Sequence, residues 1–282
     1  MSAVRATHDS PTASATTRLS DVALAYAATL HTLDGGALAR RLYDFGRRPL
    51  TDHWLSTVAA RGGVRGLLDL DRPREADRAF ARRWAPRHAT HAEHSWIVWD
   101  RAPRSRRTRP TARATYKLYV APTPATTPSA FRTAAAALAR SGAFAFKVAA
   151  GAHALLRPDK LVAYFHTRDA LDAAAAALRS ELHGMPAQPV PFTAALTPDG
   201  LLSWGTDPPG MPPAGAEGIT GTSWRAWVTT RLGAYLALAR VTNGSALAPA
   251  DFARRRLALD GVDVERWAPI APRWHDQTPP GA

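Results

Sequence analysis

The middle of the chain carries three short runs of strand-type residues, and this pattern limits the folds that the chain can adopt. A helix-type segment separates the first two runs, a short connection joins the second to the third, and another helix-type segment follows the third. The runs are YKLYVA (116–121), AFAFKV (143–148) and KLVAYF (160–165). Their aromatic and branched residues favour strands. The alanine-rich segments at 129–140 and 168–183 have the composition and end signals of helices. The central region therefore combines several strands with intervening helices.

The segments after this region extend the same pattern. VPFTAAL (190–196) and GLLSWG (200–205) predict a β-hairpin around Pro198–Gly200, because Pro, Asp and Gly favour turns. A helix is expected over 223–240, capped by Ser223, and a last short helix over 248–259. We predict an α+β fold in which an N-terminal helical subdomain precedes a mixed or antiparallel sheet flanked by helices.

The first part of the chain is predicted to be mostly helical. Helices are expected from Ser20, taken as an N-cap, to the Gly35–Gly36 pair, then over 37–45 and after Thr51 or Asp52. A further helix is expected over 74–84, before Pro86. HSWIVW (94–99) then predicts a strand.

Composition shifts divide the chain into five predicted parts. We expect a disordered N-terminus, a helical subdomain, a basic linker, an α+β domain and a loose tail. Their predicted ranges are 1–18, 19–99, 100–114, 115–275 and 276–282.

The composition excludes several classes of protein. With 282 residues, 46% of them hydrophobic, the chain is large enough for a sizeable core. It contains no cysteine, so it has no disulfide, thiolate nucleophile, CxxC zinc site or iron–sulfur cluster. No run approaches a membrane helix, and the N-terminus lacks an apolar signal-peptide stretch. We expect a cytoplasmic protein.

The net charge of +13 has two explanations. Clustered arginines, such as those at 254–256, attract the phosphates of nucleic acids. A basic groove for an anionic peptide or a phosphate explains the same excess. We favour the groove, and binding to nucleic acid is not expected.

The lysines are more informative than the total charge. Of 36 Lys and Arg residues only three are lysine, and these are Lys117, Lys147 and Lys160. A guanidinium stays protonated in proteins, whereas a buried ammonium loses its proton more readily. Chance clustering is one explanation of this pattern. The other, which we favour, is that these positions need an amine.

Side-chain alternation places the lysines on the predicted strands. Lys117 and Tyr119 share one face of their strand, and Lys147 lies opposite the two phenylalanines of its own. If these two strands are neighbours, both lysines reach one bound group. Lys160 and Arg157 are expected at the rim. The competing explanation is that strand lysines extend to water.

Such a cluster supports β-elimination from a phosphorylated residue. One lysine, poised by neighbouring cations, takes the α-proton, while other cations hold the carbonyl and the phosphate. Tyr119 or His153 would assist the leaving phosphate. The candidate residues for binding phosphate or substrate are Arg157, Lys160, Trp204, Asp207 and Arg225.

No metal or other cofactor is expected. His88, His91 and His94 lie close together but lack an HExxH pattern, so surface histidines are the simpler explanation. GxSxG, Walker A and GxGxxG motifs are absent from the sequence. Trp204, before a Gly- and Pro-rich loop, is a candidate floor for a peptide groove.

Several of these segments resemble one known family. YKLYVAPTP, FAFKVAAGAHALLRPDKLVAYF, VPFTA, LLSWGTDPP and SWRAWVTTRLGAYLALAR are similar to segments of the HopA-like effector family, over roughly residues 90–242. Proteins of this family occur in bacterial peptide-tailoring clusters for class V lanthipeptides and thioviridamide-like peptides.

The resemblance implies a lyase that works with a separate phosphotransferase-like kinase. The kinase phosphorylates Ser or Thr of a ribosomal precursor peptide (a RiPP), and the lyase eliminates the phosphate. YKLYV also looks like the Lys-x-His strand of phosphothreonine lyases. This likeness implies that Lys117 binds phosphate or carbonyl and that Lys147 is the base. The sequence departs from the lyase motif at Tyr119, which occupies the position where those enzymes carry the histidine that acts as general acid.

This departure leaves a second hypothesis open. The protein is then a non-catalytic HopA-like partner that binds a peptide or activates the kinase. Nucleic-acid binding ranks third.

Overall fold

The structure, a computed structural model, describes residues 13–70, 83–86, 95–101, 115–208, 223–241 and 247–270. Its helices are α1 (Ala15–Thr29), α2 (Gly35–Asp44), α3 (Asp52–Ala59), α4 (Val64–Leu67), α6 (Thr127–Arg140), α7 (Arg168–Glu181), α8 (Trp224–Val241) and α9 (Pro249–Leu259), with short 3-10 turns η2 (Pro124–Thr126) and η3 (Ala154–Leu156). Its strands are β1 (Trp84–Pro86), β2 (Trp96–Arg101), β3 (Tyr116–Val120), β4 (Ala145–Ala149), β5 (Leu161–Phe165), β6 (Ala194–Ala195), β7 (Leu202–Thr206), β8 (Val262–Asp263) and β9 (Ala268–Pro269).

The larger sheet has seven strands in the order β1-β2-β4-β5-β3-β7-β6, and every pair in it is antiparallel. The predicted α+β class is confirmed, and so is the hairpin, since β6 pairs with β7. β2, before the basic segment, pairs with β4, after it. The N-terminal region therefore contributes to the sheet as well as to helices.

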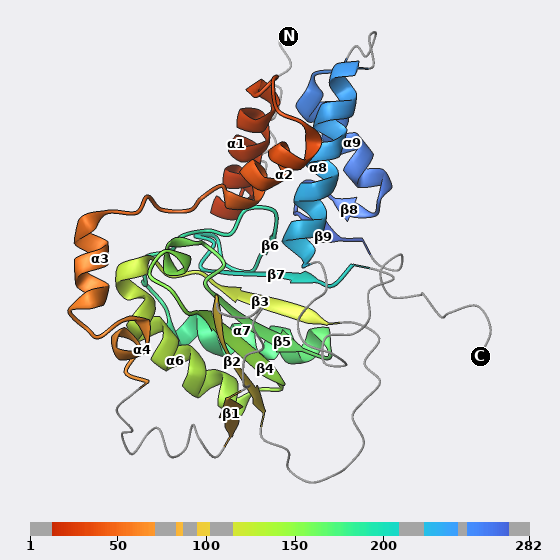
Figure 1. The fold of residues 1–282 in the computed structure, drawn as a ribbon. Coiled ribbons are helices and arrows are strands. Elements are labelled where there is room, and N and C mark those ends of the chain that lie inside the picture. The colour runs from red at the N-terminus through yellow and green to blue at the C-terminus, as the bar shows by residue number, and fades with distance from the viewer. Residues whose placement is uncertain are drawn as a thin grey trace, which may run out of the picture.

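Helices α6 and α7 cover one face of this sheet (Figure 1). Alternate strand residues, such as Leu118, Phe146 and Ala163, point into this core and are completely buried. Thr167, directly before the predicted helix, caps α7 by accepting a hydrogen bond from the Ala170 backbone N–H. This face therefore provides the apolar core beneath the candidate site.

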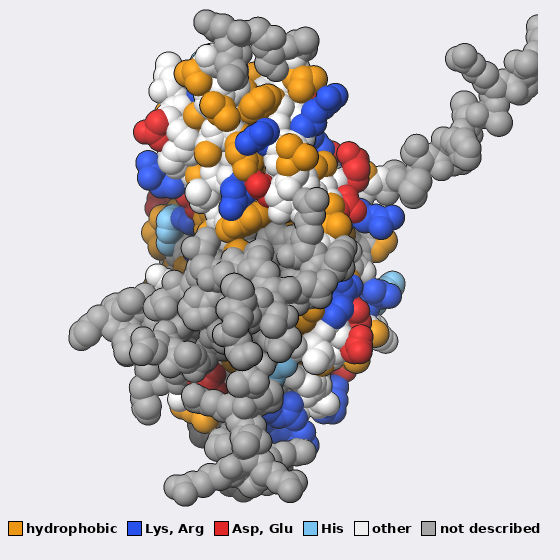
Figure 2. All heavy atoms as spheres, turned by 90° about the vertical axis from the view of Figure 1, so that its right-hand side faces the viewer, with side chains coloured by type: hydrophobic (Ala, Val, Ile, Leu, Met, Phe, Trp, Pro, Cys, Tyr) orange, Lys and Arg blue, Asp and Glu red, His pale blue; other side chains and the backbone are white. Residues whose placement is uncertain are grey.

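A second apolar core lies in the body formed by α1, α2, α8 and α9 (Figure 1). Helices α2 and α8 pack closely because Gly233 has no side chain. A Cβ on Gly233 would lie 2.3 Å from the Gly35 carbonyl oxygen. Val241, at the end of α8, is exposed. Figure 2 shows hydrophobic side chains scattered among charged ones on one face of the molecule.

The first helix begins earlier than the sequence predicts. Its N-cap is Ser14, whose side chain accepts from the Thr17 backbone N–H, so residues 15–18 are helical. Ser20 lies inside α1 and is buried; its hydroxyl donates to the Thr16 carbonyl and accepts from the Phe192 backbone N–H. Ser20 therefore joins the helix to the hairpin region and does not cap it.

The prediction of a helix over 74–84 falls almost wholly outside the described residues. At its end, Trp84 begins strand β1 instead. No helix in the described parts of the chain is long and apolar enough to span a membrane.

Candidate active site

A pocket of about 260 Å³ lies on the face of the sheet opposite α6 and α7. Its walls come from the central strands, the loop before β5, helix α2 and the start of α8. The residues that line it are Tyr43, Trp96, Lys117, Tyr119, Lys147, Arg157, Asp159, Val162, Tyr164, Ser223 and Ala226.

Strand register explains why these side chains meet. Lys147 on β4 is opposite Val162 on β5, which is opposite Tyr119 on β3. One row further along, Tyr164 on β5 is opposite Lys117 on β3. The strands of the two lysines are therefore not neighbours, because β5 lies between them. Both lysines still reach the pocket, since the three strands present the same face.

Lys147 is the amine in the pocket that is best placed to act as a base. Its Nζ lies 4.0 Å from the centre of the Trp96 ring and 5.8 Å from that of Tyr164. Among the described residues it has no carboxylate within ion-pair distance. Burial, followed by the charge of Lys117, lowers the pKa of Lys147 to about 7. A substantial fraction of this amine is therefore neutral near neutral pH.

Lys117 has a different environment. It is buried and forms an ion pair with Asp207, which directly follows β7. Its Nζ also lies 5.7 Å from the centre of the Tyr164 ring. Lys117 provides a positive charge beside Lys147.

Cations and aromatic rings alternate along the pocket. Each guanidinium or ammonium lies over a ring, at distances between 4.0 and 5.8 Å, in the series Arg225, Tyr43, Arg157, Trp96, Lys147, Tyr164 and Lys117. A cation over an aromatic face gains roughly 0.5–2 kcal/mol. The rings thus help hold several positive charges together. Asp159 pairs with Arg225 and Arg157, Asp207 pairs with Lys117, and Lys147 between them has no carboxylate partner among the described residues.

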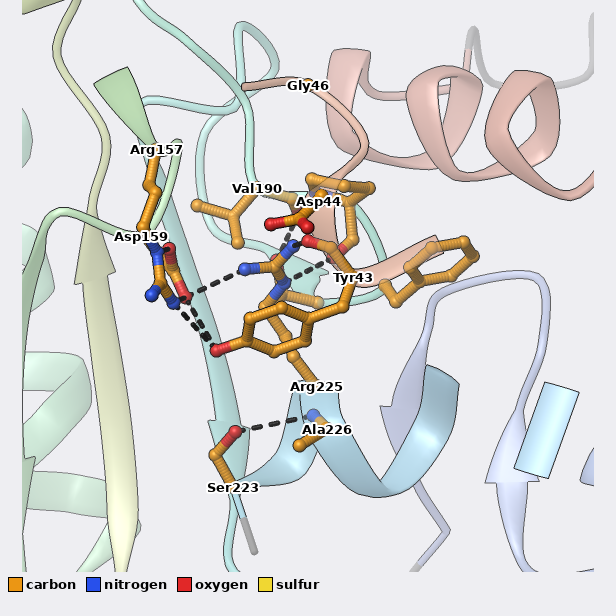
Figure 3. A network of polar contacts seen from close by, with 12 residues as sticks. Tyr43, Asp44, Gly46, Arg157, Asp159, Val190, Ser223, Arg225 and Ala226 are labelled. Carbon is orange, nitrogen blue, oxygen red and sulfur yellow. Dashed lines mark hydrogen bonds and ion pairs between the residues drawn. The ribbon is translucent and has the colours of Figure 1, made fainter. Parts of the chain in front are cut away.

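Asp159 is the carboxylate at one end, and it connects three parts of the fold (Figure 3). The Arg157 Nε and Nη2 donate to its two oxygens at 2.9 Å, and Arg225 Nη1 lies 2.8 Å from Oδ2. The Tyr43 hydroxyl on α2 donates to Asp159 Oδ2 at 3.3 Å and accepts from Arg157 at 2.8 Å. Burial alone would raise the Asp159 pKa. The charges of Arg225 and Arg157 outweigh burial and hold that pKa well below its usual range.

Arg225 is anchored as well as paired. It is almost completely buried at the start of α8, and it donates to the carbonyl oxygens of Tyr43 and Pro191. Nearby, Gly205 lets α8 approach the sheet, because a Cβ there would lie 2.7 Å from the Trp224 ring. Ser223 and Ala226 therefore reach the pocket, and the positive end of the helix dipole faces it.

Tyr119 has a buried hydroxyl that has no hydrogen-bond partner among the described residues. Burial raises the pKa of this phenol well above its ordinary value, so it stays neutral and able to donate. An unpaired buried hydroxyl destabilises a protein by about 1–3 kcal/mol. Such a group is accounted for when a ligand supplies the missing partner.

The structure places several of the predicted site residues together. Lys117, Tyr119, Lys147 and Arg157 line the pocket. Asp207 and Arg225 pair with lining residues.

Three other candidates lie outside this pocket. His153 is exposed and contacts Arg47. Lys160 is completely buried and donates to the Pro122 carbonyl and the Gln188 side chain, so it does not form a rim. Trp204 lies on the opposite face, with the Arg168 guanidinium 3.8 Å from its ring centre, so it does not floor the pocket.

The sequence analysis missed other lining residues, notably Tyr43, Trp96, Asp159 and Tyr164. Trp96 and Tyr164 could have been found by extending the strand alternation that located the lysines. Tyr43 has no such signal, because it reaches the pocket from a helix far away in the sequence.

No group of three or more His, Cys, Asp or Glu able to hold a metal ion occurs within the described ranges. The predicted cluster of His88, His91 and His94 lies outside them.

No protein-family model matches the chain, and no curated protein matches it. Among solved structures it is similar to an effector protein from Pseudomonas syringae pv. tomato strain DC3000, with 14% identity, a TM-score of 0.49, and coverage of 90% of this chain and 98% of that one. It is also similar to an effector protein from Pseudomonas syringae pv. syringae strain 61, with 17% identity, a TM-score of 0.44, and coverage of 91% of this chain and 99% of that one. The phosphothreonine lyase OspF from Shigella flexneri is 12% identical with a TM-score of 0.35, and the alignment covers 46% of this chain and 74% of that one. The structural neighbours of this chain therefore include bacterial effectors, at low identity, and a phosphothreonine lyase is among them.

Proposed function

We propose that this protein eliminates phosphate from phosphoserine or phosphothreonine in a peptide, giving dehydroalanine or dehydrobutyrine. The observation that carries the proposal is the environment of the Lys147 amine. Its amine has a pKa lowered to about 7 by burial and lies in a pocket that holds further cations. A general base works best when its pKa is close to the working pH.

The proposed step balances without an oxidant, a metal or added water. Neutral Lys147 takes the α-proton and becomes an ammonium. The electron pair of the broken Cα–H bond forms the Cα=Cβ double bond, and the Cβ–O bond breaks. Its electrons leave with the oxygen, and the departing phosphate takes up one proton to give inorganic phosphate. In net terms this is the α-proton that Lys147 removed, so release of that proton restores the neutral amine.

The other cations stabilise the charge that develops in this step. Lys117 binds the phosphate or the substrate carbonyl, where negative charge accumulates once the α-proton is removed. Arg157 and the start of α8, at Ser223, contribute positive potential for the phosphate. Arg225 acts indirectly, by holding Asp159 and through it Arg157.

Tyr119 is assigned to the leaving group. Its neutral, unpartnered hydroxyl donates a hydrogen bond to the departing phosphate oxygen. Its raised pKa makes it a weak acid, so neutralisation of the phosphate by cations contributes more to the leaving step than proton transfer does.

The proposed setting is the cytoplasm, within a peptide-tailoring pathway. The substrate is a precursor peptide that a separate phosphotransferase-like kinase has phosphorylated. This setting rests on the sequence resemblance to HopA-like proteins.

The decisive experiment is an elimination assay. The full-length protein is incubated with a phosphothreonine peptide, and with its phosphoserine counterpart, and the products are analysed by mass spectrometry. We expect loss of phosphoric acid and an unsaturated residue that adds a thiol. Retention of phosphate in every condition, including with the cognate kinase and its peptide, would contradict the proposal.

A specific observation also favours the non-catalytic alternative. Arg157 and Lys117 are already paired with carboxylates, so a phosphate must compete with Asp159 and Asp207. A pure binding module would hold phosphopeptide, or the kinase, without turnover. Tight binding of phosphopeptide by a wild-type protein that releases no phosphate would select this alternative.

A further inference from the structure

The aromatic surface of the pocket continues past Tyr164 to two residues with no role in the proposed step. His166 follows β5, and alternation puts it on the same face as Val162 and Tyr164. Phe144 precedes β4, and its ring centre lies 6.2 Å from that of Tyr164. The Phe144 and His166 rings are stacked, with centres 4.0 Å apart and planes 8° from parallel. Tyr164 lines the pocket, and Phe144 and His166 extend its aromatic surface into one strip beside the pocket.

His166 carries an unused hydrogen-bonding atom in this strip. Its Nδ1 is buried and has no partner among the described residues, although the whole side chain is only partly buried. Burial lowers the pKa of His166, so the imidazole is neutral at neutral pH. A neutral imidazole nitrogen pairs well with a backbone N–H or C=O.

The other end of the pocket is filled by protein. Asp159 and Arg225 are buried there, and Lys160 lies next to Asp159 with no exposure. The Gln188 side chain accepts from Lys160 and donates to the Gly46 and Leu156 carbonyl oxygens, which closes that end. A peptide whose phosphorylated residue occupies the pocket is therefore directed along the strip.

We propose that Phe144 and His166 form a subsite for the peptide segment next to the phosphorylated residue. This inference rests on the proposed function. Nδ1 is covered in the free protein, so the His166 ring turns to present this atom to the peptide backbone, and the aromatic rings pack against the neighbouring side chain. The strip carries no formal charge, so it favours a neighbour that is apolar or aromatic rather than charged.

The test compares two substrates in each variant of the full-length protein. One is a phosphothreonine peptide with residues on both sides, and the other is N-acetyl-phosphothreonine N-methylamide. The ratio of their kcat/KM values isolates the contribution of the flanks, because effects on the base divide out. We expect His166→Ala to reduce this ratio roughly fivefold to tenfold, since a net hydrogen bond contributes about 1 kcal/mol.

Further variants separate the two parts of the subsite. His166→Asn places an amide nitrogen near the former Nδ1 and should recover part of the ratio. Phe144→Ala should reduce the ratio without removing the hydrogen bond. His153→Ala, at an exposed histidine outside the pocket, is the matched control and should leave the ratio unchanged.

The outcomes distinguish this inference from the proposed function. An unchanged ratio in both His166→Ala and Phe144→Ala overturns the subsite. If the wild type eliminates no phosphate, the same pair of ligands is compared by binding competition against a labelled phosphothreonine peptide. If the flanking residues increase affinity in the wild type and this increase is lost in His166→Ala, the subsite is supported without the proposed function. If the flanking residues increase affinity equally in the wild type and in His166→Ala, the subsite is rejected.

Discussion

Lys147 and Lys160 are both lysines with a lowered pKa, and they differ in the groups that surround their amines. Burial is the main cause that lowers the pKa of each to about 7. Lys160 is completely buried, and its Nζ donates to the Pro122 carbonyl at 2.7 Å and to Gln188 at 2.8 Å. Lys147 lies against a ring in a cavity, and within the described ranges it has no carboxylate partner.

A lowered lysine pKa is therefore not a sign of catalysis by itself. In Lys160 the amine is occupied by protein acceptors, and the side chain is completely buried. In Lys147 the same shift coincides with a cavity and with neighbouring cations. The difference assigns a structural role to one lysine and a chemical role to the other, and each assignment can be tested.

The largest expected effect is that of Lys147→Arg on turnover. Arginine keeps the charge but does not release its proton, so kcat should fall roughly a hundredfold to ten-thousandfold. Phosphate release assays measure it. Lys117→Arg is the matched control, because an anion binder needs charge and should keep measurable turnover. Comparable loss in both variants would contradict the separate roles.

Lys160→Met should instead reduce stability. It leaves the Pro122 carbonyl and the Gln188 side chain without a donor, and we expect a loss of about 1–3 kcal/mol in the free energy of unfolding. Urea denaturation measures it. Lys147→Met is the counterpart and should cost less stability, because that amine has no hydrogen-bond partner in the described structure.

The pH dependence of that loss has a definite sign. Below pH 7 Lys160 is protonated in both states, so its contribution is constant. Between its folded pKa of about 7 and its unfolded value of 10.5, the unfolded chain binds more protons, so the stability of the wild type rises with pH. The difference between wild type and Lys160→Met should therefore grow from pH 7 to 10. A difference that stays flat over this range would show that the buried amine stays charged.

The pH profile of turnover tests the other lysine. Because the base must be neutral, kcat/KM should fall about tenfold per pH unit below the Lys147 pKa of about 7, and level off above it. The phosphate of the substrate also ionises, with a pKa of about 6. The pH profile is therefore fitted with two ionisations on its acidic side, one for Lys147 and one for the phosphate. A plateau that continues unchanged down to pH 6 would place the base elsewhere.

The smallest expected effect is that of Tyr119→Phe, and it has opposite signs for activity and stability. Turnover should fall a fewfold to about tenfold, because a hydrogen bond to the leaving group is lost. Stability should stay the same or rise slightly, because the buried hydroxyl has no partner to lose. Tyr235→Phe is the control. Its hydroxyl donates to Asp260 at 2.6 Å, and the side chain packs against the second core and does not line the pocket, so this variant should lose stability and keep turnover.

Much of the sheet was predictable from local sequence. The runs containing Lys117, Lys147 and Tyr164 alternate clearly, so both their strand character and the shared face of Lys117 and Tyr119 follow from the sequence. The Thr167 cap and the hairpin before β7 are equally local signals.

Strand order and distant partners were not predictable in this way. Alternation gives the face of Lys147 but not the insertion of β5 between β4 and β3. The pairing of Asp159 with Arg225 joins a loop to a helix 66 residues later, and Tyr43 comes from the other direction along the chain. Lys160 looked like a rim residue because its acceptors, Pro122 and Gln188, lie outside the strand that carries it.

The Asp159 network has a consequence for the protein while it is being made. Tyr43 leaves the ribosome early, whereas Arg225 is among the last described residues to emerge. Until Arg225 arrives, Asp159 lacks one of its two guanidinium partners, and α8 does not yet close the pocket. A nascent chain that already contains all three lysines is therefore expected to be inert. Its chemistry begins only after the C-terminal helices have docked.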